Sequence, residues 1–262
     1  MDGLNSEWLP PPDTMILSGQ EVHVWRAGLD EPADRVLELQ QVLAADELVR
    51  ADRFYFPKDR DRYIVGRGLL RAILGHYFAL DPGELQFQYS EFGKPALIPS
   101  NKHEALNFNL SHSHDLALFA FAAGREIGVD LERIRLDMEY EQIAENFFSE
   151  QERTALRALP AAQKGEAFFN CWTRKEAYIK ARGDGLTFPL DRFDVSLAPD
   201  RPARLLEVRG AEMEAVRWKL AALSPGPGFV GAVAVEGADW RLKGWQWSQG
   251  WSDRWLSGSS SR

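Results

Sequence analysis

Cysteine, long apolar segments and an excess of positive charge are all scarce or missing in this chain of 262 residues. The single cysteine, Cys171, excludes an internal disulfide, and its helical sequence context predicts a small buried side chain. No run of 18 apolar residues occurs, and the start, MDGLNSEWLPPPD, lacks the basic and apolar regions of a signal sequence. We therefore expect a cytoplasmic protein with no membrane association.

The net charge limits the classes of ligand. A formal charge of -8 argues against general nucleic-acid binding, which needs a net basic surface. Basic residues are instead concentrated between positions 50 and 71, where seven lysines and arginines stand against three aspartates. This local surplus of positive charge predicts the place where an anionic ligand binds.

Hydrophobic periodicity divides the chain into two halves with the same order of elements. Alternation predicts a strand at 21–27, and apolar steps of three and four predict helices at 35–43, 45–53 and 59–78. One strand and three helices return at 127–132, 139–146, 149–159 and 165–182. Further short strands are predicted at 85–89, 106–110 and 116–122, and at 192–197, 216–220 and 229–235.

This repeat predicts two α+β subdomains of like architecture, residues 1–124 and 125–262, joined near Gly124. A ligand site in the cleft between the two halves is the natural expectation. The tryptophan-rich end of the chain carries no recognisable motif, and the low-complexity tail at 257–262 is predicted to be disordered.

Two carboxylates lie close together in the sequence Gly-Val-Asp-Leu-Glu at 128–132. Asp130 and Glu132 are two apart in a predicted strand, so both point to one face while Val129 and Leu131 point into a core. A solvated strand edge is one interpretation, because the pattern is common. The alternative is a hard divalent cation held between the like charges, since carboxylate oxygens suit magnesium.

A second cluster of charge lies in the predicted long helix, in the sequence WTRKEAYIK at 172–180. Glu176 interrupts the apolar face of this helix, between Trp172 and Phe169 on a helical wheel. A surface ion pair between Glu176 and Lys180 explains these two residues alone. It does not explain a charge within an apolar seam, which favours a metal or a polyanion against that face.

Two further segments supply polar groups. The sequence NFNLSHS at 107–113 is a predicted strand running into polar residues, with Ser111 and His112 able to contact a ligand at its end. The sequence YSEFGKP at 89–95 predicts a turn from which Lys94 projects. By themselves, both fit structural or surface roles as well.

Together these segments resemble the Sfp-type 4'-phosphopantetheinyl transferases. The family's G-[IV]-D-[ILV]-E and W-x-x-K-E-[AS]-x-x-K elements correspond to 128–132 and 172–180. Its G-K-P, F-N-[IL]-S-H-S and R-F-[YF] elements correspond to 93–95, 108–113 and 53–55. The order and spacing match over roughly residues 50–190. The resemblance implies a pseudo-twofold pair of α+β subdomains with the active site in the cleft between them.

The resemblance also implies an activity, the transfer of phosphopantetheine from coenzyme A to a carrier serine, and a metal, Mg²⁺ or alternatively Mn²⁺. By this similarity, Asp130, Glu132 and Glu176 bind the metal, and Asp130 thereby contacts coenzyme A. The metal would be expected to neutralise charge on the pyrophosphate oxygens. Glu176 is also expected to accept the serine proton, and Lys180 to stabilise the leaving adenosine 3',5'-bisphosphate.

The same similarity assigns the remaining contacts with coenzyme A. Arg62 and His112 are expected at its 3'-phosphate, and Lys94, Ser111 and Lys180 at its nucleotide or phosphate groups. By the same resemblance, the expected partner is an apo acyl carrier protein or a peptidyl or aryl carrier domain. Fatty-acid, polyketide and nonribosomal-peptide carriers all fit, because each offers a serine on an acidic helix. A fused pair of halves favours a monomer.

Two other classes of function remain compatible with the residues alone. A magnesium-dependent phosphohydrolase or nuclease also uses paired carboxylates and basic residues, but attacks with water. A non-catalytic module that binds an acidic helical protein is the third possibility. Mass analysis of a carrier mixed with coenzyme A separates the three classes.

Overall fold

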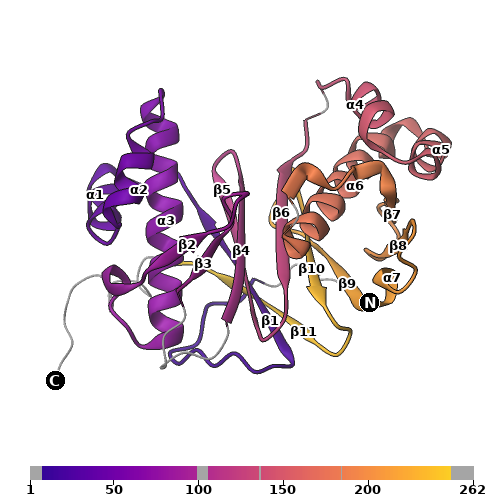
Figure 1. Ribbon diagram of the computed structural model, residues 1–262. Helices are drawn as coiled ribbons and strands as arrows, with labels where there is room; N and C mark the ends of the chain where they lie inside the picture. Colours follow the sequence, from indigo (N-terminus) through magenta and orange to yellow (C-terminus); the bar gives the residue numbers. More distant parts are fainter. Residues whose placement is uncertain (1–7, 99–105, 136, 184, 249–262) are drawn as a thin grey trace.

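The computed structural model describes residues 8–98, 106–135, 137–183 and 185–248. Within them the fold is α+β, as predicted, with helices outside and strands between them (Figure 1). The elements of the first half are β1 (Glu21–Gly28), α1 (Ala33–Gln41), α2 (Ala45–Ala51), α3 (Pro57–Phe78), the 3-10 helix η1 (Pro82–Glu84), β2 (Phe87–Tyr89), β3 (Pro95–Leu97), β4 (Leu106–Ser113) and β5 (Leu116–Ala123).

The second half begins with the same order of one strand and three helices. Its elements are β6 (Ile127–Arg133), α4 (Tyr140–Phe147), α5 (Glu150–Ala158), α6 (Ala161–Arg182), the 3-10 helices η2 (Gly185–Thr187) and η3 (Leu190–Arg192), β7 (Phe193–Val195), β8 (Leu205–Val208), α7 (Glu214–Arg217), β9 (Trp218–Leu223), β10 (Phe229–Glu236) and β11 (Arg241–Gln246). The predicted repeat of elements is therefore present in the fold. The predicted tail at 257–262 lies outside the described residues.

Two sheets pack against each other, and one long helix covers the outer face of each. The first sheet has the strand order β11-β1-β5-β4, and the second has the order β6-β10-β9. Strand β5 is apolar along its whole length because both of its faces are buried. Phe119 and Phe121 pack toward α3, while Leu118 and Ala120 join the core between the sheets. This sandwich places α3 and α6 on opposite sides of the joint between the halves (Figure 1).

Side chains bridge that joint. Strand β4 lies beside β6, yet the two belong to different sheets. Alternate residues of β4 supply the contacts: the main-chain N–H of Val129 donates to Asn109 Oδ1 at 2.9 Å, and Ser113 Oγ donates to Glu132 Oε2 at 3.1 Å. The intervening side chains of β4, Leu110 and His112, point the other way. Side chains on one face of β4 therefore contact β6, and Leu110 and His112 on the other face point toward the space beneath α3.

The predicted end of β4 was wrong. The polar residues after Leu110 suggested that the strand stops there, but it continues to Ser113. Ser111 and Ser113 are buried and hydrogen-bonded across the joint to carboxylates of β6. Their polarity therefore reflects partners on another strand rather than a strand end.

The short strands β3, β8 and β11 were missed by the sequence analysis. Strand β11 comes from the tryptophan-rich end, and it pairs in parallel with β1, more than 200 residues earlier. Trp245 and Trp247 pack in the core of the first half, and Trp240 packs between the two sheets. Residues after Gly124 therefore complete the sheet that the first half begins. The division of the chain into units at 124 and 125 stays a prediction.

None of the helices within the described ranges combines the length and the apolar character that a bilayer crossing requires. The single cysteine is fully buried in α6, as predicted. Burial raises the pKa of the Cys171 thiol well above its ordinary value, which keeps the thiol protonated and unreactive at neutral pH.

Candidate active site

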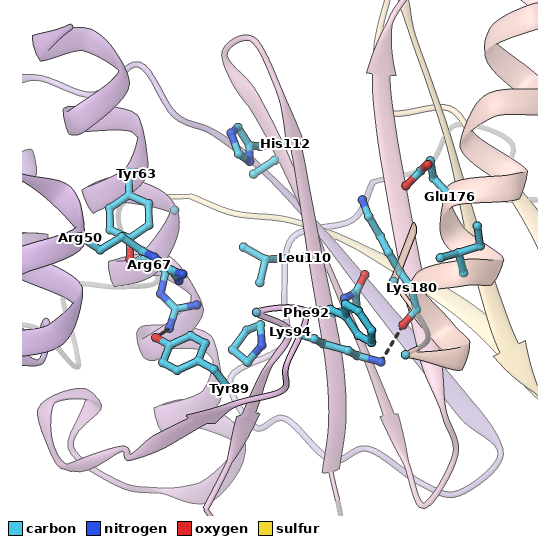
Figure 2. Close-up of a pocket in the computed structure, with 18 of the residues that line it drawn as sticks. Arg50, Tyr63, Arg67, Tyr89, Phe92, Lys94, Leu110, His112, Glu176 and Lys180 are labelled. Carbon is cyan, nitrogen blue, oxygen red and sulfur yellow. Dashed lines mark hydrogen bonds between the residues drawn. The ribbon is translucent and has the colours of Figure 1, made fainter. Parts of the chain in front are cut away.

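A cavity of about 560 Å³ lies where the two halves meet. Helix α3, the turn between β2 and β3, and strand β4 form one side, and α6 with the turn after it forms the other (Figure 2). The charged and aromatic side chains on the first side are Arg50, Arg62, Tyr63, Arg67, Tyr89, Phe92, Lys94 and His112. Glu176 and Lys180 project from the second side. The cavity therefore sets a mainly basic wall opposite a wall with mixed charge.

Arg62 enters the cavity from the first turns of α3. Its guanidinium donates to both carboxylate oxygens of Asp30, at 2.7 and 3.0 Å. The bond from Arg62 lowers the pKa of Asp30 to about 2, with a smaller contribution from Lys58. Asp30 thus holds Arg62 in one orientation and keeps it charged at the cavity wall.

His112 lies on strand β4 (Figure 2) and lines the same cavity as Arg62. Partial loss of hydration lowers the pKa of its imidazole, and the positive charges of Lys180 and Arg62 lower it further. The ring is therefore neutral at pH 7. A negatively charged ligand beside the ring would raise this pKa.

The basic wall is built differently from the simple surplus of charge that the sequence suggested. Arg71 is almost fully buried and donates to Glu47 Oε2 at 2.6 Å, so it serves the core. Arg67 donates to Glu47 Oε1 at 2.8 Å and also to the Tyr89 hydroxyl at 2.9 Å, at the cavity wall. Spacing along α3 predicts which of these side chains share a face, but not which carboxylate lies beneath them.

Three carboxylates predicted as metal ligands lie on β6 and α6. Asp130 is buried, and its Oδ1 accepts hydrogen bonds from Lys180 Nζ at 2.6 Å and Ser111 Oγ at 2.9 Å. Its other oxygen, Oδ2, is buried and has no hydrogen-bond partner among the described residues. Within the same part of the chain, we find no hydrogen bond or ion pair to the Glu176 carboxylate.

Repulsion between these carboxylates affects the pKa values of two of them. Burial raises the pKa of Glu132 and of Glu176, and the negative charge of Asp130 raises both further. No group of three His, Cys, Asp or Glu side chains in the described ranges is close enough to hold an ion as it stands. The donor chemistry nevertheless fits a hard divalent cation. Asp130 Oδ2 has no hydrogen-bond partner among the described residues, and the charged forms of Glu132 and Glu176 are disfavoured by burial and by Asp130. A divalent cation would compensate these negative charges.

The close packing of α6 on β6 requires glycine at position 128, the first residue of the Gly-Val-Asp-Leu-Glu motif. A Cβ atom at this position would collide with the main chain of Ala177 and Ala181 in α6. Helix α6 therefore packs directly on the backbone of β6, which brings Lys180 to Asp130. The side chains of Val129 and Leu131 point into the core between the sheets, as the strand pattern predicted.

Ser111 and Lys94 are placed differently from the other predicted site residues. Ser111 faces β6, outside the residues that line the cavity, and its hydroxyl is bound to Asp130. Lys94 lines the cavity, but its Nζ donates to the main-chain oxygens of Lys180 at 2.8 Å and Ile127 at 3.2 Å. Their contacts with coenzyme A stay predictions.

Lys175 has a role that the sequence did not reveal. Its side chain is completely buried, and its Nζ lies 2.8 Å from Glu152 Oε2. The ammonium also donates to the main-chain oxygens of Leu190 and Phe193, each at 2.7 Å. Thus the first lysine of the 172–180 motif ties α5 and η3 to α6, while Lys180 remains at the cavity.

Comparison with known proteins identifies the family. A family model described as 4'-phosphopantetheinyl transferase superfamily matches residues 126–234, and one described as 4'-phosphopantetheinyl transferase, N-terminal, matches residues 31–124. The chain is 44% identical over 244 residues to the 4'-phosphopantetheinyl transferase HetI of Nostoc sp., covering 93% of this chain and 100% of that protein. The chain belongs to the Sfp-type 4'-phosphopantetheinyl transferase family. The resemblance drawn from the motifs is thereby confirmed.

More distant phosphopantetheinyl transferases also match. The chain is 32% identical over 161 residues to Sfp of Bacillus subtilis, covering 60% of this chain and 68% of that one. A putative 4'-phosphopantetheinyl transferase of Synechocystis sp. is 32% identical over 169 residues, covering 64% and 68%. As a phosphopantetheinyl transferase, this protein moves the phosphopantetheine group of coenzyme A onto carrier proteins.

Proposed function

We propose that the transfer is magnesium-dependent and takes place in the cavity between the halves, from coenzyme A to a serine of an apo acyl or peptidyl carrier. The observation that carries this proposal is the pairing of a basic wall on α3 and β4 with a wall that presents Glu176 and Lys180. Such a cavity suits a polyanionic donor on one side and a proton transfer on the other.

The basic wall binds the donor. Arg62, fixed by Asp30, and His112 hold the 3'-phosphate, and the guanidinium of Arg62 offers the planar donor geometry that suits a phosphate. Lys180 contacts the phosphate groups from the opposite wall. Ser111 acts through Asp130, to which its hydroxyl is bonded. These contacts orient the reacting phosphate between the two halves.

Glu176 is the proposed general base for the attacking serine. Burial and the neighbouring Asp130 raise the pKa of its carboxyl, which makes the carboxylate a stronger proton acceptor than an exposed one. Lys180 offsets the charge that develops on the departing adenosine 3',5'-bisphosphate. Its ammonium now lies on Asp130 and moves toward the leaving phosphate when that charge forms.

Asp130, Glu132 and Glu176 would hold the magnesium ion. When bound, the ion neutralises charge on the pyrophosphate oxygens. Asp130→Ala tests this set: carrier loading should fall about 100-fold at limiting magnesium, because one carboxylate donor is lost. Undiminished loading by this variant at limiting magnesium contradicts the ligand assignment.

We further propose a monomer, because the chain supplies both walls of the cavity itself. A cytoplasmic location is consistent with one buried, unpaired cysteine. Sedimentation at several concentrations tests the monomer, and fractionation of the producing cells tests the location.

The decisive experiment mixes the chain with coenzyme A, magnesium and several apo carriers and measures the mass of each carrier. A gain of about 340 Da, the increment that this chemistry requires, demonstrates transfer. Breakdown of coenzyme A without a mass gain would instead indicate hydrolysis. If neither a mass gain nor breakdown of coenzyme A is observed, the result favours a non-catalytic binding module. Comparing fatty-acid, polyketide and nonribosomal-peptide carriers in one assay identifies the class of partner.

A further inference from the structure

Lys94 crosses from one half of the molecule to the other. It follows the turn between β2 and β3 in the first half. Its Nζ donates to two carbonyls of the second half, Lys180 O at 2.8 Å (Figure 2) and Ile127 O at 3.2 Å. Among the described residues, the carboxylate that pairs with this ammonium is that of Glu126, at 3.9 Å. The ammonium therefore bonds mainly to main-chain carbonyls.

The carbonyl of Lys180 needs such a donor. The last four carbonyls of a helix lack partners within it, and α6 ends at Arg182. Gly183 adopts a left-handed conformation and its N–H caps the carbonyl of Ile179, which leaves the carbonyl of Lys180 to another donor. A cation at this end of a helix is also favoured by the helix dipole. Lys94 thus caps the helix turn that carries Lys180.

A second contact secures the same turn. The ring of Phe92, two residues before Lys94, packs against Gly185, just beyond the end of α6. A Cβ atom on Gly185 would lie 2.6 Å from this ring, and Gly185 has a positive φ of 60°. Both features require glycine there. The β2–β3 turn and the end of α6 therefore fit together by side-chain packing as well as by hydrogen bonds.

We propose that Lys94 is a positioning residue, which acts by holding the last turn of α6 rather than by binding coenzyme A. The proposal rests on the function proposed above. Fixing this turn sets the side chain of Lys180, which reaches Asp130 at 2.6 Å, and that of Glu176, one turn earlier at the cavity. The ammonium gives two of its three N–H groups to these carbonyls, so at most one is left for a phosphate.

The two roles predict different losses in Lys94→Met. A positioning role lowers kcat about tenfold and leaves the Kd for coenzyme A, measured by calorimetry, within about twofold, because Arg62 and His112 are unchanged. Direct contact with a phosphate weakens coenzyme A about tenfold and makes the loss smaller at high salt. A lower melting temperature with normal kcat and Kd would mean a purely structural role. Either of the last two results overturns the proposal.

A double-mutant cycle with Lys180→Ala tests whether Lys94 acts through Lys180. If it does, Lys94→Met costs clearly less in kcat when Lys180 is already absent than in the unaltered protein, and the loss that remains is the share carried by Glu176. Full additivity of the two losses overturns the proposal. Lys164→Met is the matched control, because Lys164 lies near the other end of α6 and pairs with Glu141. Its loading rate should equal that of the unaltered protein.

Gly185→Ala keeps the charge of Lys94 but displaces the turn, so it covers the case in which Lys94→Met fails to fold. It should lower kcat and leave the Kd for coenzyme A within about twofold. Normal kcat in a folded Gly185→Ala variant contradicts the proposal. Absence of loading by the unaltered protein would refute the proposed function itself, and is seen before any variant is made.

Discussion

Each half of the molecule buries one glutamate at the third position of a short helix, but the two glutamates neutralise different partners. In the first half, Glu47 of α2 pairs with Arg67 and Arg71 of α3. In the second half, Glu152 of α5 pairs with Lys175 of α6. Both glutamates also accept a main-chain N–H at the start of their own helix, from Ala44 and Ser149 respectively.

This difference matches the charges that each half presents to the cavity. Two arginines fill the first site, and one of them, Arg67, continues to the cavity and the Tyr89 hydroxyl. One lysine fills the second site and donates its remaining protons to main-chain carbonyls, so its charge does not reach the cavity. The buried glutamate at the third helix position therefore supports the basic wall of the cavity in the first half. In the second half it pairs with a lysine that does not reach the cavity, where Glu176 and Lys180 are the charged side chains.

The largest expected effect separates the two buried glutamates. Glu47→Gln and Glu152→Gln should each lower the free energy of unfolding by about 3–5 kcal/mol, because a buried cation loses its partner. Glu47→Gln should cost more, since it leaves two arginines uncompensated. Urea unfolding monitored by circular dichroism measures both. Glu38→Gln, which removes a half-exposed partner of Arg35, should cost less than about 1 kcal/mol. If Glu152→Gln lowers the free energy of unfolding as much as Glu47→Gln or more, the proposed difference between the two buried glutamates is wrong.

Acid stability should distinguish the halves next, because all five histidines precede Gly124. Burial lowers the pKa of His23 from 6.5 to about 4, so the folded state keeps this imidazole neutral. Between these values the unfolded chain binds the extra proton, and stability falls as the pH falls from 6.5 to 4. The loss amounts to about 3 kcal/mol at most.

Urea unfolding across this pH range, compared between the unaltered protein and His23→Gln, measures the contribution. The variant should lose less stability on acidification. The same pH dependence in both proteins would show that His23 is not responsible, and that another group carries the acid sensitivity.

Glu176 and Lys180 should differ in the way they lower turnover. Glu176→Gln keeps the shape but removes charge and basicity, so carrier loading should fall about 100-fold and require more magnesium. Lys180→Ala should give a similar loss with nearly unchanged magnesium dependence. Loading rates across a magnesium titration, with thermal melts as the control for folding, measure both. Near-normal rates in both variants would contradict the proposed roles of Glu176 and Lys180 in the transfer.

The smallest expected effect concerns the basic wall. Arg62→Ala should weaken coenzyme A about tenfold and dephospho-coenzyme A much less, because only the former carries the 3'-phosphate. Calorimetry at two salt concentrations measures both affinities, and the difference should shrink at high salt. Lys58→Ala is the matched control, since Lys58 also pairs with Asp30 but does not line the cavity. Equal losses for both ligands would place Arg62 away from the phosphate.

Local patterns in the sequence determined most of the secondary structure and the content of the site. The steps of three and four that form α3 and α6, and the alternation that puts Asp130 and Glu132 on one face, depend on neighbours within a few residues. For the same reason the repeat of one strand and three helices was visible, and so was the motif set shared with the transferase family.

Tertiary structure alone decided which of these groups are available for chemistry. Lys175 and Lys180 are five residues apart on one helix, yet one is sealed against Glu152 and the other faces the cavity. The pairing of β11 with β1 joins residues from opposite ends of the chain, which no local pattern encodes. Burial and partnership depend on surfaces brought together from distant segments, and those surfaces exist only once the sheets have packed.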